Sequence, residues 1–385
     1  MLTYSTEELL EFVEETVPTR DIYKDELPTP SLILDLDVFE SNVRTMEGFL
    51  RAAGQGIRPH AKTHKCPQIA KYQVKTGASG VCVARIAEAE AMCRAGVPGV
   101  LISSPVIGKN AVSRLMRLAA NYPELMVVVD HPVGLAMLSD AAEAAGIVVN
   151  VVIDLDVGLK RTGALPGKPA LELAELIMKK PHLKFCGLQA FAGCTHVPGF
   201  ENRRSTSLEM MGRAVDTRRL LEKSGIEVPM LSGGSTGTYN IDSELSGVTE
   251  QQVGSYVFMD VDYRAIGGKR GPVFNDFGPA LWVISTVVSH TYKYQVTLDA
   301  GLKSFATDRP YVPEVRGIAG VRYAFGGDEH GRLYLEYPSQ EIKLGDRLDL
   351  MVTHCDPNVN LFDRIFCLRG NRVETVWTIE ARGRS

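Results

Sequence analysis

Eight short runs rich in β-branched residues recur between residues 57 and 258, and helical patterns lie between most of them. The runs cover residues 57–61, 80–84, 100–103, 125–130, 148–154, 185–190, 229–232 and 253–258. Helical patterns such as IAEAEAMCRAG and GLAMLSDAAEAAG each close at a glycine, a common helix stop. Strands that alternate with helices pair in parallel, so eight such units predict an α/β fold, a closed (β/α)8 barrel of the TIM type. An open, doubly wound sheet is the alternative, but no GxGxxG segment follows an early strand to favour it.

A second, β-rich domain is predicted after about residue 265. The segments WVISTVVSH, YQVTLDAGL, GRLYLEY, DRLDLMVTH and FCLRGNRVETVW have strand character and are joined by Gly/Asp turns. A chain of 385 residues also exceeds the usual size of a single compact core. We therefore expect a barrel over residues 31–265 and a β-rich domain built from residues 1–30 and 266–385. The segment TPSLILDLD, which precedes the barrel runs, is expected to add a strand to the β-rich domain.

Charge and hydropathy exclude several classes of partner. The formal net charge of −4 and the lack of a basic block with interleaved aromatic residues give no footprint for nucleic acid. No apolar run approaches the roughly 18 residues needed to span a membrane. The N-terminal stretch MLTYSTEELLEFVEETVPTR is acidic and amphipathic, unlike a signal peptide. Seven cysteines without a CxxC pair favour reduced thiols, so we expect a cytoplasmic protein.

The first barrel run leads into a lysine that is a candidate nucleophile. Lys62 lies in the segment RPHAKTHK, and the active site of such a barrel lies at the carboxyl ends of its strands. A partly desolvated amine at that position would have a lowered pKa and would suit a Schiff base. A surface cluster of basic residues after a strand explains the same segment equally well.

Three further segments follow barrel runs and suit an anionic cofactor. The segment SGGSTGT, residues 232–238, which we call the phosphate cup, offers small residues whose backbone N–H groups can surround an anion. Gly254 and Ser255 follow the predicted eighth strand beside it, and TIM barrels often bind phosphate after their last two strands. Arg161, after the fifth run, is placed to bond an anionic oxygen, although a solvated loop arginine is the simpler interpretation of that residue alone.

In the β-rich part, His354 and Asp356 end a strand-like run in the segment THCDP. Residues two apart on an extended chain face the same side, so the imidazole and the carboxylate could bind a divalent ion such as Mn²⁺, Mg²⁺ or Zn²⁺, with Cys355 pointing away. A turn with a buried histidine is the alternative.

Taken together, these segments resemble the D-threonine aldolase and D-3-hydroxyaspartate aldolase branch of the fold-type III enzymes, which use pyridoxal 5′-phosphate (PLP) and share the alanine racemase barrel. The segments RPHAKTHK, GLQAF, SGGSTGTY, QQVGSYVFMD, LDAGLKS, DEHG and HCDP match in order from TPSLILDLD to ETVWTIEARG. The resemblance implies that Lys62 carries PLP and that Arg161 contacts its phenolic oxygen. It also implies cofactor contacts for Gln189 and Tyr256. The phosphate contacts that it implies are Ser235, Thr236, Gly237, Gly254 and Ser255.

The resemblance further implies a PLP-dependent carbon–carbon lyase that is a homodimer and acts on small D-amino acids. Relatives with His-x-Asp are aldolases and those with His-x-Cys are D-serine dehydratases, so His354 and Asp356 match the aldolase form and its metal. Two departures bear on the substrate and on the base. Phe191 stands where relatives usually have tyrosine, and His196, the candidate proton acceptor, lies one place earlier than the usual histidine.

Three functions are compatible with these residues. The first is an aldolase that cleaves D-β-hydroxy amino acids to glycine, or another simple amino acid, and an aldehyde or keto acid. The second is a dehydratase or racemase on the same scaffold. The third is a non-catalytic PLP-binding protein, which the two-domain length and the HCDP segment disfavour.

Overall fold

The computed structural model describes residue 18 and residues 20–383, and the chain divides into two compact units. The barrel unit comprises residues 44–62 and 69–254 with residue 383, and the β unit comprises residues 63–68, 255–382 and the described part of 1–43. Most of the acidic N-terminal stretch, residues 1–17 and 19, lies outside the described residues, so the structure does not test the expectation made for it.

The barrel unit contains eight parallel strands in the order β2-β9-β8-β7-β6-β5-β4-β3. A parallel bridge between His60 and Cys82 joins β2 to β3 and closes the ring, so the predicted barrel is confirmed. The strands are β2 (Gly56–Ile57), β3 (Cys82–Val83), β4 (Leu101–Ile102), β5 (Met126–Val129), β6 (Val149–Leu155), β7 (Leu183–Ala190), β8 (Leu231–Gly233) and β9 (Glu250–Gln251).

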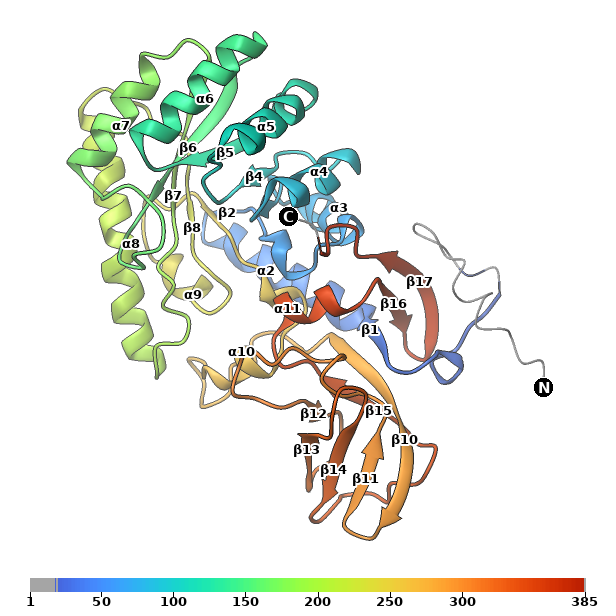
Figure 1. Cartoon of the computed structure of the whole chain (residues 1–385). Coiled ribbons are helices and arrows are strands. Elements are labelled where there is room, and N and C mark those ends of the chain that lie inside the picture. Colours follow the sequence, from blue (N-terminus) through green and yellow to red (C-terminus); the bar gives the residue numbers. More distant parts are fainter. Residues whose placement is uncertain (1–17, 19, 384–385) are drawn as a thin grey trace. The chain divides into compact units, whose positions relative to one another are not determined.

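Helices follow the strands along the outside of the barrel, as Figure 1 shows for α5 to α8. They are α3 (Pro67–Thr76), α4 (Ile86–Arg94), α5 (Lys109–Asn121), α6 (Pro132–Ala145), α7 (Lys168–Met178), α8 (Phe200–Lys223) and the single turn α9 (Tyr239–Asp242). The main core of this unit lies between strands and helices, where Val151, Ile153 and Leu188 pack against helix residues such as Leu115 and Leu173. The spacing of apolar residues at helical and strand periods accounts for this layer.

The last barrel strand differs from the prediction. We expected it at residues 253–258, but β9 is Glu250–Gln251, and Ser255–Val257 form a 3-10 helix. The prediction was wrong because both residues of β9 are polar, yet both are buried. Glu250 bonds with Arg58 inside the barrel, and Gln251 points the other way, to Gln55 and the carbonyl of Tyr239. The polarity of β9 hid the strand from a search for β-branched runs.

A chain of buried polar groups crosses the interior of the barrel. Arg58 donates to Glu250 at 2.7 Å and 3.2 Å, and both side chains are 8 % exposed. Ser232 donates to the same carboxylate at 2.8 Å and accepts from Gln252 at 3.0 Å. Barrel interiors are usually filled by branched aliphatic side chains, so here a buried ion pair and its hydrogen bonds occupy part of that space.

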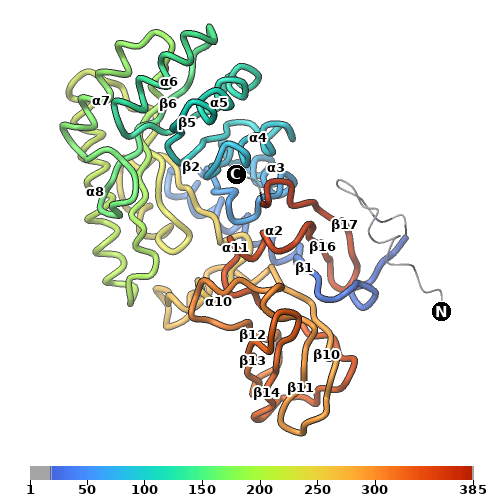
Figure 2. The backbone as a smooth tube through the Cα atoms, viewed as in Figure 1, coloured from blue at the N-terminus to red at the C-terminus, as the bar shows by residue number. Residues whose placement is uncertain are grey.

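The β unit is a nine-stranded sheet that carries the strand expected from TPSLILDLD. This strand, β1 (Ser31–Asp35), pairs antiparallel with β10 (Leu281–Tyr292) and parallel with β16 (Arg364–Arg369). Figure 2 shows β1, near the start of the chain, beside β16, near its end. The other strands are β11 (Gln295–Leu298), β12 (Glu314–Val315), β13 (Val321–Phe325), β14 (Gly331–Leu335), β15 (Arg347–Met351) and β17 (Arg372–Thr378).

The described residues form three further α-helices. Helix α2 (Leu36–Ala52) follows β1, and the short helices α10 (Val261–Ala265) and α11 (Cys355–Asn358) belong to the β unit. All seven cysteines are free thiols. Among the described residues, none of the helices combines the length and the apolar character that a membrane crossing requires.

The buried pair yields the first prediction. Glu250→Gln should lower the free energy of unfolding of the barrel unit by about 3 kcal/mol, because it leaves the Arg58 guanidinium buried without its counter-charge. The measurement is urea unfolding followed by circular dichroism. Glu172→Gln is the matched control, since it breaks the exposed Lys168–Glu172 pair and should change stability by less than about 0.5 kcal/mol. Equal effects of the two substitutions would show that the Arg58–Glu250 pair does not hold the barrel.

Candidate active site

Lys62 lies in the 3-10 helix Ala61–Thr63, just after β2, at the carboxyl end of the barrel. Its backbone N–H donates to Nδ1 of His60 at 3.4 Å, and Nε2 of His60 lies 3.0 Å from the hydroxyl of Ser103. That hydroxyl donates to the carbonyl of Val83, so His60 carries its proton on Nε2 and orients the segment that presents Lys62. The Lys62 side chain is exposed in this chain, whereas we had expected partial desolvation.

Arg161 lies in the loop that follows β6, and two carboxylates anchor this loop. Thr162 donates to Asp154 at 2.8 Å, and the backbone N–H of Gly163 donates to Asp130 at 3.1 Å. Asp154 is 5 % exposed, and burial raises its pKa to about 6, although the hydrogen bonds from Gln189 and Thr162 act to lower it. The two carboxylates thus hold the loop that presents the Arg161 guanidinium to solvent.

The ring of Phe191 lies against the guanidinium of Arg161. Arg161 lies over its ring, with 5.7 Å between Cζ and the ring centroid, a distance at which the cation is attracted to the aromatic face. The Phe191 ring therefore contacts Arg161 through its face.

The side-chain amide of Gln189, on β7, uses both its nitrogen and its oxygen in hydrogen bonds within the protein. Its Nε2 donates to Asp154 at 2.9 Å and to the carbonyl of Ser103 at 3.1 Å, and its Oε1 accepts from Gln252 at 3.1 Å. It therefore joins the polar chain of Arg58, Glu250, Ser232 and Gln252 to the Arg161 loop. Asp154, Glu250 and Gln252 were not predicted as site residues, because their only signal in the sequence is polarity in or beside a predicted strand.

The phosphate cup has the geometry of an anion site. The backbone N–H groups of Ser235, Gly237 and Gly254 donate to no other residue within 20–383. At Gly234, φ is +80°, and a Cβ atom would lie 2.9 Å from Oε1 of Gln251 and 3.0 Å from Oδ2 of Asp242. At Gly233 a Cβ atom would lie 2.3 Å from the carbonyl oxygen of Ala190. Only glycine fits at positions 233 and 234. The backbone N–H groups that have no acceptor within the protein suit a phosphate.

The remaining cofactor candidates differ in how accessible they are. Thr236 is buried in the cup, whereas His196 is exposed in the loop after β7. Ser255 and Tyr256 belong to the β unit. Tyr256 is fully buried with its ring 5.9 Å from that of Phe277, and the hydroxyl of Ser255 bonds with Tyr263.

His354 and Asp356 lie in the β unit, but not on an extended chain as expected. His354 is extended, with φ −151° and ψ 119°, while Asp356 lies in the helical turn α11 that begins at Cys355. The geometric argument for a shared face was therefore wrong. The Cys355 thiol is buried, and burial raises its pKa well above the usual range, so it does not supply a ready thiolate.

A different observation fits a metal at His354. Its Nδ1 lies 2.7 Å from Oδ2 of Asp308, so the other ring nitrogen keeps its lone pair for a ligand. Histidines that ligate metals usually donate their second N–H to a carboxylate in this way. Within residue 18 and residues 20–383, however, no three histidine, cysteine or acidic side chains gather as a metal-binding group. A metal here would have two protein ligands completed by water or substrate.

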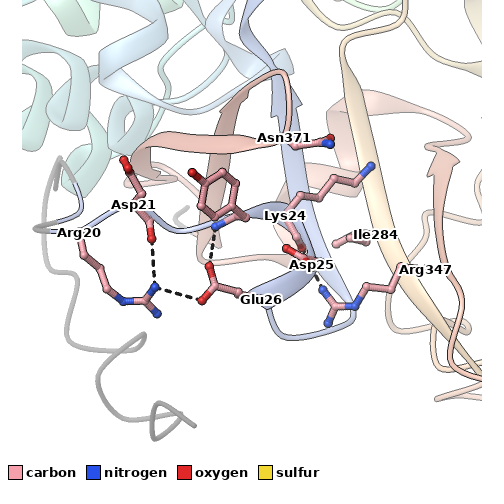
Figure 3. Close-up of a pocket in the computed structure, with 9 residues that line it drawn as sticks. Arg20, Asp21, Lys24, Asp25, Glu26, Ile284, Arg347 and Asn371 are labelled. Carbon is pink, nitrogen blue, oxygen red and sulfur yellow. Dashed lines mark hydrogen bonds and ion pairs between the residues drawn. The ribbon is translucent and has the colours of Figure 1, made fainter. Parts of the chain in front are cut away.

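A cavity of about 680 Å³ in the β unit contains none of the predicted site residues (Figure 3). Two of its arginines already have hydrogen-bond partners within the protein. Arg20 donates to Glu26 at 3.0 Å, and Arg347 donates to the carbonyl of Lys24 at 2.9 Å. We therefore do not assign the active site to this cavity.

Comparisons with known proteins agree with this geometry. Residues 34–262 match the family model of the alanine racemase N-terminal domain, and residues 280–368 match that of a putative serine dehydratase domain. The chain is 36 % identical to the 3-hydroxy-D-aspartate aldolase of Paracoccus denitrificans (strain Pd 1222), with 93 % of each chain covered. It is 38 % identical to the D-threonine aldolase of an Arthrobacter species, with 92 % of this chain and 93 % of the relative covered.

A solved structure gives the same result for the fold. The D-threonine aldolase of Filomicrobium marinum superposes with a TM-score of 0.89 at 36 % identity, covering 96 % of this chain and 99 % of that one. The similarity thus spans both compact units.

The cup yields the second prediction. Gly234→Ala should weaken PLP binding about tenfold or more, because the new methyl group displaces Gln251 or Asp242 and distorts the loop. Equilibrium dialysis of PLP against the protein measures this. Gly225→Ala is the matched control, with a similar φ of +82° but nothing within 4 Å of the added atom. It should cost some stability but leave PLP affinity unchanged. If both variants bind PLP like the parent, the phosphate is held elsewhere.

Proposed function

The chain belongs to the alanine racemase N-terminal domain family of PLP enzymes, and from this premise we propose that it is a lyase that cleaves D-β-hydroxy amino acids. The products would be glycine, or a similarly small amino acid, and an aldehyde or keto acid. The observation that carries the proposal is the arrangement at one end of the barrel, where Lys62, Arg161 and the phosphate cup all follow parallel strands. The similarity to two aldolases over more than nine-tenths of the chain supports it.

The residues of the barrel unit would each hold a different part of the cofactor. The Lys62 amine would bond to the aldehyde carbon, Arg161 would donate to the phenolic oxygen, and the backbone N–H groups of the cup would bind the phosphate. PLP, when bound, accepts the electron pair that remains on Cα when one of its bonds breaks. The protein decides which bond that is, by the position of its acids and bases.

Aldol cleavage also needs groups that act on the β-oxygen. The β-hydroxyl must lose its proton as the Cα–Cβ bond breaks, so that the C–O bond becomes a carbonyl, and Cα must then gain a proton. His196, exposed after β7, is our candidate to accept the hydroxyl proton, directly or through water. A divalent ion held by His354 and Asp356 would lower the pKa of that hydroxyl as a Lewis acid. The Asp308 contact supports His354 in this role.

A dehydratase is the second candidate, favoured by the match of residues 280–368 to the putative serine dehydratase domain. It would use the same residues to expel the hydroxyl group instead of deprotonating it. The carboxylate Asp356, two residues after His354, favours the aldolase, because the sequence resemblance places a cysteine there in dehydratases. We further propose that the protein is a cytoplasmic homodimer whose partner is a small D-amino acid.

The third prediction concerns Lys62. The protein with PLP should absorb near ~410–430 nm, as expected for an imine between lysine and the cofactor. Borohydride should then fix the cofactor to the peptide that contains Lys62, which mass spectrometry identifies. Lys62→Ala should abolish both signals, while Lys71→Ala, on the outer helix α3, should leave them intact. Recovery of the label on Lys65 would overturn the assignment.

The fourth prediction tests the reaction and the metal together. D-threonine should yield glycine and acetaldehyde in equal amounts, measured by chromatography and by an aldehyde-reducing coupled assay. Chelation should lower the rate by at least about tenfold, because the β-hydroxyl loses its Lewis acid. Added Mn²⁺ should restore the rate of the parent but not that of His354→Ala, whose remaining carboxylate binds the ion weakly.

The controls for this experiment separate the alternatives. Cys355→Ser should respond to chelation and Mn²⁺ like the parent, because the thiol is buried away from solvent. The absorbance near ~410–430 nm should persist in His354→Ala, since the imine needs only Lys62. Keto acid plus ammonia as products would favour the dehydratase, and full activity of chelated His354→Ala would remove the metal from the mechanism.

A further inference from the structure

A chain of hydroxyl groups runs from the segment after β7 through the phosphate cup to a buried carboxylate, entirely within the barrel unit. The Oγ1 of Thr195 lies 2.9 Å from Oγ of Ser235, which lies 3.0 Å from Oγ1 of Thr238. Thr238 in turn donates to Oδ2 of Asp242 at 2.6 Å. Ser235, a cup residue, is therefore joined to Asp242 by two hydrogen bonds through Thr238, and Thr195 contacts Ser235 on its other side.

Asp242 is an unusual group to find beneath an anion site. Its side chain is fully buried, and Ser207 and Thr238 are its two donors, at 2.6 Å each. It forms no ion pair with any residue that the structure describes. A buried carboxylate without a counter-charge favours its protonated form.

The other charged or titratable groups around Asp242 are few. From the segment after β7, the Cys194 thiol interacts with Asp242, and burial raises the pKa of that thiol. From helix α8, the fully buried Arg203 donates to the carbonyl of Gly237 at 3.0 Å, and burial lowers the pKa of Arg203. From β9, the neutral side chain of Gln251 shares with Asp242 the space beside Gly234.

The direction in which these hydroxyls donate their hydrogen bonds depends on whether Asp242 is protonated, because each hydroxyl has a single proton to give. When Asp242 is ionised, Thr238 gives its proton to the carboxylate and must accept from Ser235. The Ser235 proton is then used, and its oxygen offers a bound phosphate only lone pairs. When Asp242 is protonated it can donate to Thr238, and Thr238 then donates to Ser235. The Ser235 proton is no longer given to Thr238, and a bound phosphate oxygen competes for it with Oγ1 of Thr195.

We propose that Asp242 is a positioning residue of the phosphate cup, whose protonation reverses the hydroxyl chain and turns Ser235 into a donor to the cofactor phosphate. This inference rests on the proposed binding of PLP at the cup and adds a proton-linked control to it. An ionised Asp242 also repels the phosphate, so both effects have the same sign.

The expected pH range follows from the burial of this acid. Burial raises the pKa of Asp242 to about 6, although the hydrogen bonds from Ser207 and Thr238 oppose the shift. A raised pKa means that the protonated form predominates below about pH 6 and is lost as the pH rises. Affinity for PLP should therefore fall, through this group, as the pH rises through that value. The phosphate of PLP itself titrates near pH 6, so the experiment must compare variants at each pH.

The test is the dissociation constant of PLP, measured by equilibrium dialysis between about pH 5 and pH 8, for the parent and for Asp242→Asn. Asparagine does not titrate, so the constant of this variant should follow only the ligand and the other groups of the site, which the parent shares. The ratio of the parent constant to the variant constant should rise about fivefold across this range, as expected for one hydrogen bond gained or lost. A ratio that stays flat while both proteins bind PLP would overturn the inference.

A second variant and a control complete the design. Ser207→Ala removes a hydrogen bond that stabilises the ionised carboxylate, so the midpoint of the pH dependence should move upward. This variant also keeps the test valid if Asp242→Asn does not fold. Asp216→Asn removes an exposed carboxylate from the same helix α8 and should follow the parent at every pH. If the parent binds no PLP at any pH, the proposed function itself fails, which is a different outcome from a flat ratio.

Discussion

The buried pair between Arg58 and Glu250 is the interaction on which the barrel unit depends. The two residues are 192 positions apart, and their contact joins the first barrel strand to the last. Arg58 also reaches the carbonyl of Gly99, next to β4. Charges taken out of water are stable only when their partners are well placed, so the pair constrains how β2, β9 and β8 align with one another.

From this pair, hydrogen bonds lead toward the cofactor residues. Glu250 accepts from Ser232, which begins the cup, and Gln252 joins Ser232 to Gln189. Gln189 continues to Asp154, which holds the Arg161 loop. The residues that would bind the two ends of PLP are therefore fixed by one connected set of buried groups. Such networks specify a single arrangement when every member is satisfied.

The sequence predicted the parts of this protein that depend on local patterns. Alternating β-branched and helical segments gave seven of the eight barrel strands nearly in place, and Lys62, Arg161 and the cup all follow strands as expected. What it missed depends on contacts distant along the chain. Glu250 and Gln251 are buried in a strand because Glu250 meets Arg58 inside the barrel and Gln251 meets Gln55 on the opposite face. Arg58 and Gln55 are distant along the chain, so no nearby residue reveals those partners. The turn after His354 escaped notice because Cys355 and Asp356 are compatible with either an extended chain or a helix.

The stacking of Arg161 on Phe191 also decides which hydrogens the arginine keeps. A guanidinium has five N–H groups in a flat fork, and Arg161 gives none of them to another residue that the structure describes. A phenol in place of the phenyl ring would add an oxygen that accepts hydrogen bonds beside that fork. The bare ring attracts the cation without competing for its protons. All five hydrogens of Arg161 therefore remain available to whatever oxygen enters the mouth of the barrel.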